Sequence, residues 1–241
     1  DKVTGTISVK NLTLQVGEKY ILKDVSFTIK PQTRTAIIGP TGSGKSQLLY
    51  LLCGLIEATS GSILYDDTVL EKYDKNSLLT QIGLVFEDSV IFNMSFHENI
   101  AFSEIVKEET LEKAIKTAEL EDFINSLPDK LQTVASERGT SLSGGQKQRL
   151  MLARALAIDP TILFLDDFTA RVDTKTEQKI LANVKENYPQ LTLISVTQKI
   201  TSVEEYDQIL VMMEGELIAQ GTHHELLKSS PEYAQIYNSP R

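Results

Sequence analysis

The sequence has no tryptophan, one cysteine and three histidines, and it lacks any run of about 18 apolar residues. The single cysteine, Cys53, excludes a disulfide framework within the chain and is typical of a reducing compartment. The missing apolar run argues against a membrane-spanning helix in these residues, and the amino end DKVTGTISVK is unlike a signal peptide. The histidines, His97, His223 and His224, have no ligand spacing with cysteine or carboxylates, which argues against a zinc site.

The charge balance and composition indicate a folded, acidic domain. Lysine and arginine number 24 against 33 aspartates and glutamates, a net charge of -9, which argues against nucleic acid as the main partner. With 41% hydrophobic and 24% charged residues, wholesale disorder is excluded, and 241 residues can bury a core without disulfide or metal support. Composition therefore predicts a soluble cytosolic domain. Because the chain begins at Asp1 rather than Met, we expect it to be a piece of a longer polypeptide.

Short apolar runs predict most of the strands. Two β-branched runs, Ile7–Leu14 and Ile21–Ile29, predict strands joined by the turn Gly17–Lys19. Further runs bounded by polar residues predict strands covered on both faces. They are Thr35–Ile38, Ile82–Phe86, Ile162–Leu165, Leu191–Val196, Ile209–Met213 and Leu217–Gln220.

Helical periodicity marks the remaining segments. Residues 95–157 have a helical period, clearest at Leu111–Leu120, and contain no convincing strand, which predicts a helical insertion in a chain that otherwise alternates strands and helices. Near the carboxyl end, Thr222 is expected to cap a helix, followed by a loop at Pro231 and another short helix.

A glycine-rich loop follows the predicted strand Thr35–Ile38 and precedes an apolar helix pattern that begins with Gln47. It fits G-x-x-x-x-G-K-[ST] and consists of Gly39, Pro40, Thr41, Gly42, Ser43, Gly44, Lys45 and Ser46. Glycines let backbone N–H groups converge on phosphate oxygens, Lys45 reaches the β- and γ-phosphates, and the Ser46 hydroxyl can ligate Mg²⁺. The chain is therefore predicted to bind a nucleoside triphosphate together with Mg²⁺.

The carboxylate that completes such a site is expected at the end of another hydrophobic strand. Asp166 directly follows the run Thr161–Leu165. Its side chain can therefore hold Mg²⁺ through water at the carboxyl edge of the sheet.

The string Leu142-Ser143-Gly144-Gly145-Gln146, continued as KQRLMLARAL, resembles the signature motif of ABC-type ATPases, the nucleotide-binding domains of ABC transporters. The resemblance covers essentially the whole chain. It implies an α/β fold of ABC-ATPase type, with a P-loop NTPase core (a RecA-like, mainly parallel sheet), an antiparallel β subdomain and a helical subdomain. We expect a single domain over residues 1–241, with the core and β subdomain at about 1–94 and 158–241 and the helical subdomain at about 95–157.

The resemblance also implies how the domain is used. In this family two such domains pair head to tail, and ATP lies between the phosphate loop of one and the signature motif of the other. Ser143, Gly144, Gly145 and Gln146 would then contact ATP bound to the partner, through hydroxyl, N–H groups and helix dipole. Tyr20 stands where the family places an aromatic ring that stacks on adenine, although such a tyrosine is also typical of a half-buried strand.

Two segments are similar to the exporter branch of the family. Val90–Ile100 is similar to the segment near the coupling helices of the membrane domain, and Ser136–Gly139 resembles the exporters' cross-talk loop. In exporters this domain is commonly fused behind six membrane helices. The resemblance thus implies transmembrane domains fused before Asp1, a location on the cytoplasmic side of the cell membrane, and a second nucleotide-binding domain as partner.

Four positions depart from the family pattern. Asp167 replaces the glutamate that polarises the attacking water, and withdrawing this carboxylate by about 1 Å can cost on the order of 10²-fold in rate. Gln198 replaces the switch histidine and can donate a hydrogen bond but carries no proton. Glu87 replaces the glutamine of the Q-loop and could still ligate Mg²⁺. Arg171 is bulkier and charged where the D-loop has a small or apolar residue.

Groups that bind nucleotide are thus retained while groups that hydrolyse it are weakened. This pattern resembles the degenerate-site half of a heterodimeric ABC exporter, in which this chain cleaves ATP slowly and its signature completes a partner with a full catalytic site. Two alternatives remain open: a regulatory ATP-binding module without turnover, and a homodimeric ABC ATPase.

Overall fold

The computed structural model describes residues 2–135 and 142–239, so the exporter-like segment Ser136–Gly139 lies outside the described residues. The strands are β1 (Ile7–Val16), β2 (Lys19–Ile29), β3 (Arg34–Ile38), β4 (Ser60–Tyr65), β5 (Thr68–Val69), β6 (Ile82–Val85), β7 (Ile162–Asp166), β8 (Thr192–Val196), β9 (Gln208–Met213) and β10 (Glu216–Gly221). The α-helices are α1 (Lys45–Leu52), α2 (Lys75–Leu79), α3 (Phe96–Ile100), α4 (Glu108–Thr117), α5 (Glu121–Asn125), α6 (Gly144–Ala157), α7 (Thr174–Asn187), α8 (His223–Ser229) and α9 (Pro231–Asn238).

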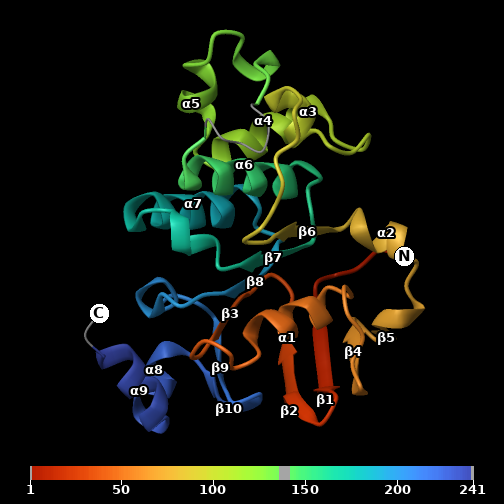
Figure 1. Cartoon of the computed structure of the whole chain (residues 1–241), viewed down its shortest axis with the longest axis vertical. Coiled ribbons are helices and arrows are strands. Elements are labelled where there is room, and N and C mark those ends of the chain that lie inside the picture. Colours follow the sequence, from red (N-terminus) through yellow and green to blue (C-terminus); the bar gives the residue numbers. More distant parts are fainter. Residues whose placement is uncertain (1, 136–141, 240–241) are drawn as a thin grey trace.

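The strands form two sheets (Figure 1). One has the order β10-β9-β3-β8-β7-β6 and is parallel except for its β9–β10 edge. The other, in the order β2-β1-β4-β5, is antiparallel throughout. A mainly parallel core sheet beside a separate antiparallel sheet confirms the predicted α/β fold.

The parallel sheet is covered on both faces, and α1 lies between the two sheets. Leu48 and Leu49 of α1 are fully buried in a cluster that contains residues of both sheets. Along β3, Ile37 joins this cluster, whereas Ala36 and Ile38 join the opposite one with residues of α6 and α7. This alternation is the two-residue period of a strand, and it explains why the predicted strands are apolar without a polar face.

The described residues between β6 and β7 form helices joined by turns and loops, and their only strand-like pairing is an isolated bridge between Ser95 and Val134 that the sequence did not predict. Helix α4 begins and ends three residues before the predicted Leu111–Leu120. It ends early because Glu119 has a left-handed backbone, with φ of 57°, which a helix cannot continue through. In Figure 1, α3, α4 and α5 lie together at the end of the molecule farthest from β1 and β2.

Strands β4 and β5 were not predicted. Strand β4 starts with Ser60, Gly61 and Ser62, which are weak strand formers, and β5 has only two residues. Their pairing depends on close approach to β1, because a Cβ on Gly61 would lie 2.3 Å from the Asn11 carbonyl oxygen. A two-residue hairpin turn joins β1 to β2, since Val16 pairs with Lys19.

At the carboxyl end, the predicted helix cap is confirmed and the predicted loop is wrong. The Thr222 hydroxyl accepts a hydrogen bond from the Glu225 N–H at 3.3 Å and caps α8. Pro231 does not lie in a loop but begins α9, which Ser230 caps. Proline suits the first helical turn because its missing N–H has no partner there.

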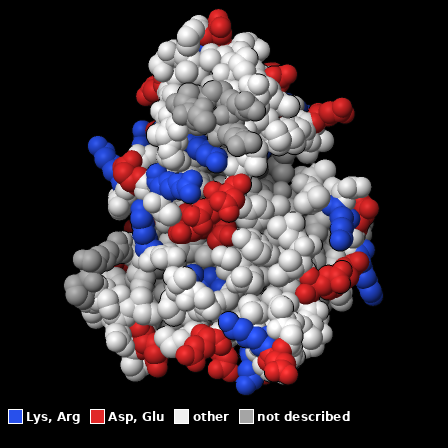
Figure 2. All heavy atoms as spheres, viewed as in Figure 1, with Lys and Arg blue, Asp and Glu red and all other residues white. Residues whose placement is uncertain are grey.

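Within residues 2–135 and 142–239, no helix has the length and apolar character needed to cross a bilayer. On the face drawn in Figure 2, lysine and arginine side chains are interspersed with aspartate and glutamate side chains and form no continuous basic surface.

Candidate functional site

The phosphate loop connects the end of β3 to the start of α1, and its shape requires glycine at two positions. A Cβ on Gly39 would lie 2.1 Å from the Met212 carbonyl oxygen, and one on Gly44 would lie 2.7 Å from a Leu22 methyl group. Gly44 also has φ of 95°, a conformation that other residues rarely adopt. The loop therefore packs closely against β9 and β2, and it leaves the N–H groups at the start of α1 free for an anion.

A pocket of about 210 Å³ at this end of α1 gathers residues that are far apart in the sequence. They come from the phosphate loop and from the carboxyl ends of β6, β7 and β8, where parallel strands position polar side chains. The lining residues are Thr41, Gly42, Gly44, Lys45, Ser46, Gln47, Glu87, Asp166, Asp167, Val196 and Gln198. Of the residues expected to serve this chain's own ATP, Ser43 and Tyr20 are not among them.

Ser43 and Tyr20 lie near the loop without lining the pocket. Ser43 is almost fully buried, and its N–H donates to the Pro40 carbonyl at 3.1 Å. Tyr20 on β2 is 51% exposed. The next residue, Ile21, has its carbonyl oxygen 2.9 Å from the Cβ position of Gly44, so Tyr20 adjoins the part of β2 that packs on the phosphate loop.

Two hydroxyl groups fix the Asp166 carboxylate. Ser46 Oγ donates to Oδ1 at 3.2 Å, and Tyr50 Oη donates to Oδ2 at 3.1 Å. Burial and the charge of Asp166 raise the pKa of Tyr50 to about 12, so its hydroxyl keeps the proton that it donates. Sequence analysis missed Tyr50, although it lies on the same helix as Ser46, one turn further along.

The oxygen atoms of this site fit Mg²⁺ only together with phosphate. The described part of the chain contains no group of three or more His, Cys, Asp or Glu side chains arranged to hold a metal ion by themselves. Mg²⁺ usually binds through one or two carboxylates, a hydroxyl and phosphate oxygens, keeping some water. Ser46 and Asp166, 3.2 Å apart, provide the protein part of that set.

Lys45 is held across the loop, where its charge faces the pocket. Its Nζ donates to the carbonyl oxygens of Gly39 and Pro40 at 2.6 and 2.9 Å. Burial lowers the pKa of Lys45, and the nearby carboxylates of Asp167 and Asp166 oppose that shift. An anion that takes the place of these carbonyl contacts would meet a desolvated ammonium group.

Asp167 stands among like charges at the end of β7. Its backbone is left-handed, with φ of 49° and ψ of 36°, a conformation that aspartate tolerates better than most residues. Burial raises the pKa of Asp167, the charges of Glu87 and Asp166 raise it further, and Lys45 and Lys199 oppose the shift.

The loop that carries Gln198 is anchored on both sides. The hydroxyls of Thr197 and Thr169 are hydrogen-bonded at 3.0 Å, and Lys199 Nζ donates to the Val172 carbonyl at 3.0 Å. Both contacts tie the segment after β8 to the segment after β7. Gln198 and Asp167 therefore line the pocket from two connected loops.

The predicted signature residues lie at the start of α6 and do not line the pocket. Ser143 caps the helix, since its Oγ accepts from the Gln146 N–H at 3.1 Å and Gln146 Oε1 accepts from the Ser143 N–H at 2.9 Å. The side chain of Arg171 lies against Gly144, with its Cδ 3.3 Å from the position of a Cβ there.

Arg154 is a second residue that sequence analysis missed. This half-buried cation of α6 donates from Nε to the Asn99 carbonyl at 2.7 Å and from Nη1 to the Val90 carbonyl at 3.0 Å. Its guanidinium lies 5.4 and 5.3 Å from the ring centres of Phe92 and Phe102. Burial lowers the pKa of Arg154 to about 10, so it remains charged at neutral pH. A lone charge within the apolar run LMLARALA is the signal that could have marked it.

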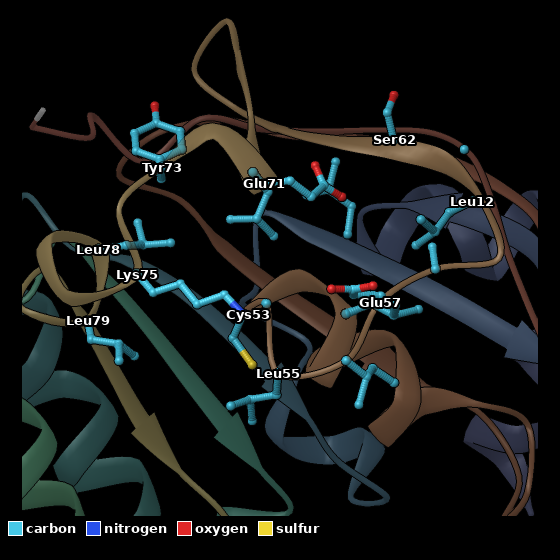
Figure 3. A pocket seen from close by; sticks show the side chains of 17 residues that line it. Leu12, Cys53, Leu55, Glu57, Ser62, Glu71, Tyr73, Lys75, Leu78 and Leu79 are labelled. Carbon is cyan, nitrogen blue, oxygen red and sulfur yellow. The ribbon is translucent and has the colours of Figure 1, made fainter.

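A different, apolar cavity of about 350 Å³ lies at the other end of α1 (Figure 3). Leu12, Leu55, Leu78 and Cys53 are among its lining side chains, and Lys75 is its basic residue. The phosphate loop contributes nothing to it, so its chemistry does not suit a triphosphate.

Comparison with known proteins identifies relatives that match nearly all of this chain. The sequence model of a family described as ABC transporter matches residues 22–170. The chain is 41% identical over 242 residues to the uncharacterized ABC transporter ATP-binding protein YfiB of Bacillus subtilis, covering 99% of the chain and 42% of that protein. It is 39% identical over 240 residues to the ATP-dependent lipid A-core flippase of Nitrosococcus oceani, covering 98% of the chain and 40% of that protein.

A solved structure has the same fold. A bacterial Atm1-family ABC exporter with ATP bound matches with a TM-score of 0.92 and 35% sequence identity, over 97% of this chain and 41% of that one. The chain thus spans about two fifths of the length of the relatives that it matches.

Proposed function

The chain belongs to the ABC transporter family, and from this premise we propose that it is the ATP-binding domain of an exporter, pairing head to tail with a second nucleotide-binding domain. The pocket at the start of α1 carries the proposal, because it joins the phosphate loop to Asp166, Asp167 and Gln198. Similarity over 97% of the chain to an exporter with ATP bound supports it.

The pocket offers groups that suit the phosphates of a triphosphate. The N–H groups of the phosphate loop and the Lys45 ammonium bind the β- and γ-phosphates. Ser46 and Asp166 hold Mg²⁺, with Glu87 as a further oxygen ligand on the same pocket wall. The metal ion neutralises phosphate charge when bound. Tyr20, exposed on β2 beside the loop, stacks on the adenine.

The same pocket is poorly equipped to activate water. Asp167 has a shorter reach than glutamate, and Gln198 cannot take up a proton. We infer that this chain's own site is degenerate and cleaves ATP slowly. Its signature residues, Ser143 to Gln146, complete the site of a partner that has a full catalytic set, which makes the transporter a heterodimer.

The segment from Val90 to Phe102 supports contact with a membrane domain fused before this domain. Val90, Phe92 and Met94 are 55%, 36% and 37% exposed although they are large and apolar. Arg154 fastens the segment to α6, the helix that begins at the signature residues. Movement of the paired domains on ATP binding and product release would therefore reach the membrane helices through this segment.

The proposal predicts that the isolated chain binds Mg-ATP but hydrolyses it barely above background. Losing a well-placed general base typically slows catalysis by about 10²- to 10⁴-fold, while phosphate binding does not depend on it. Calorimetry measures binding, phosphate release measures hydrolysis, and Lys45→Ala serves as the variant that cannot bind. Turnover as fast as that of a family member with the usual glutamate and histidine would contradict a degenerate site.

Two alternative functions make different predictions. The presence of both Asp167 and Gln198 in the pocket also favours a regulatory module without turnover. Such a module predicts no single-turnover hydrolysis at this site once the partner's site is disabled. A homodimeric ATPase predicts ATP-driven self-association of this chain, which light scattering detects.

A further inference from the structure

Two of the positions that depart from the family pattern meet in the structure. Glu87 follows β6 and Arg171 follows β7, and Arg171 Nη2 lies 3.8 Å from Glu87 Oε1. The side chain of Glu87 is 53% exposed and that of Arg171 is 42% exposed. A pair this long and this exposed adds little to folding stability. Its significance lies in its position, because Glu87 lines the ATP pocket.

Glu87 adds negative charge where a triphosphate would bind. The pocket lining already contains the carboxylates of Asp166 and Asp167, with Lys45 as its one cation. A third carboxylate on the same wall repels phosphate oxygens, and a nearby cation reduces that repulsion. Arg171 is outside the pocket lining but next to Glu87, as a counter-ion should be.

The side chain of Arg171 is also held in place. A Cβ placed on Gly144 would lie 3.3 to 3.7 Å from the Cβ, Cγ and Cδ atoms of Arg171. A Cβ placed on Gly145 would lie 3.1 Å from the Arg171 carbonyl oxygen. The apolar stem therefore rests on the start of α6, and the guanidinium needs little further ordering to stay near Glu87. A side chain at residue 144 would crowd this stem.

We propose that Arg171 is the counter-ion of Glu87 and that the two act as one unit which sets the affinity of this chain for ATP. The charge of Arg171 offsets that of Glu87 while no metal is bound, and Glu87 would depend less on Arg171 if it also served as an oxygen ligand of Mg²⁺. This inference rests on the proposed function, because it assumes that the pocket binds ATP.

A double-mutant cycle tests the unit in the whole chain. ATP affinity is measured by calorimetry with EDTA present, for the wild type, Glu87→Gln, Arg171→Ala and the double variant. We expect Arg171→Ala to weaken ATP binding about threefold or more, since an uncompensated charge several ångströms away has an effect of that order. In the Glu87→Gln background the same change should have almost no effect.

Further measurements separate charge from structure. Arg171→Lys should keep most of the affinity, because it retains the charge. The effect of Arg171→Ala should shrink with Mg²⁺, and also at about 1 M salt, where the screening length falls to about 3 Å. Lys179→Ala, which removes an exposed cation that pairs with Glu119, is the control and should bind ATP like the wild type.

Three outcomes overturn the proposal. An equal loss in both backgrounds would mean that Arg171 acts on ATP without Glu87. An unchanged affinity in Arg171→Ala would mean that the pair has no part in binding. A wild-type chain that binds ATP neither with EDTA nor with Mg²⁺ would remove the proposed function itself, a result distinct from the other two.

Discussion

At the scale of single residues, the neighbouring carboxylates of Asp166 and Asp167 are held in different ways. Asp166 is fixed by the hydroxyls of Ser46 and Tyr50, so its carboxylate is oriented before any ligand arrives. Asp167 has no such support for catalysis: its side chain is short, and burial and neighbouring carboxylates raise its pKa. Gln198 lines the same pocket, and its amide side chain cannot gain or lose a proton.

Restoring the usual residues should therefore restore hydrolysis. Asp167→Glu combined with Gln198→His is expected to raise the rate at this site by about 10²-fold, because the carboxylate regains its reach and the switch position regains a protonatable ring. Phosphate release is measured in the assembled transporter with the partner's site disabled. An unchanged rate would place the defect elsewhere, for example at Glu87.

At the scale of elements, helix α6 connects two parts of the molecule. Its first turn carries the signature residues, capped by Ser143, and its third turn carries Arg154. Arg154 ties the Val90–Phe102 segment to α6 through the carbonyls of Val90 and Asn99 and through two aromatic rings. The segment contributes few helical hydrogen bonds of its own, since α3 has only five residues.

Removing this cation should therefore destabilise the whole domain. Arg154→Met keeps the length of the side chain but removes its hydrogen bonds to the carbonyls of buried Asn99 and exposed Val90, and it is expected to lower the free energy of unfolding by about 1 to 3 kcal/mol. Urea titration followed by circular dichroism measures the change. Lys179→Ala on the exposed face of α7 is the control and should have a much smaller effect. Equal stability of both variants would show that the Arg154 contacts do not hold the segment.

At the scale of the whole molecule, α1 links the ATP site to the packing between the two sheets. Its start forms the pocket wall, and its buried leucines belong to the core that both sheets share. Cys53 directly follows α1, is 4% exposed and lines the apolar cavity of Figure 3. Burial raises the pKa of its thiol to about 12.

Cys53 should report opening of this core. Because burial raises the pKa of the thiol and keeps it protonated at pH 8, reaction with a thiol reagent should be slow in the folded chain and fast in urea. Saturating ATP should slow it further, because a ligand present at about 100 times its Kd stabilises the folded state by about 2.7 kcal/mol. Mass spectrometry follows labelling of the single cysteine. The same rate with and without ATP would mean that this end of α1 opens independently of the pocket.

Local patterns in the sequence determined the phosphate loop, the helix that Ser143 caps and most strands, because each depends on residues close together in the chain. They also placed Asp166, Asp167 and Gln198 at strand ends, which a parallel sheet brings to one edge. Strand β4 escaped prediction because its pairing depends on close approach to Asn11, not on its own weak strand residues.

Only the tertiary structure could decide which distant side chains meet. Tyr50 on Asp166, Arg154 on the Val90–Phe102 segment and Arg171 on Glu87 each join separate elements, so no spacing in the sequence encodes them. The last of these contacts changes the meaning of two departures from the family pattern. From the sequence they are separate substitutions, whereas in the folded chain they are opposite charges 3.8 Å apart, and electrostatic energy depends on that distance rather than on separation along the chain.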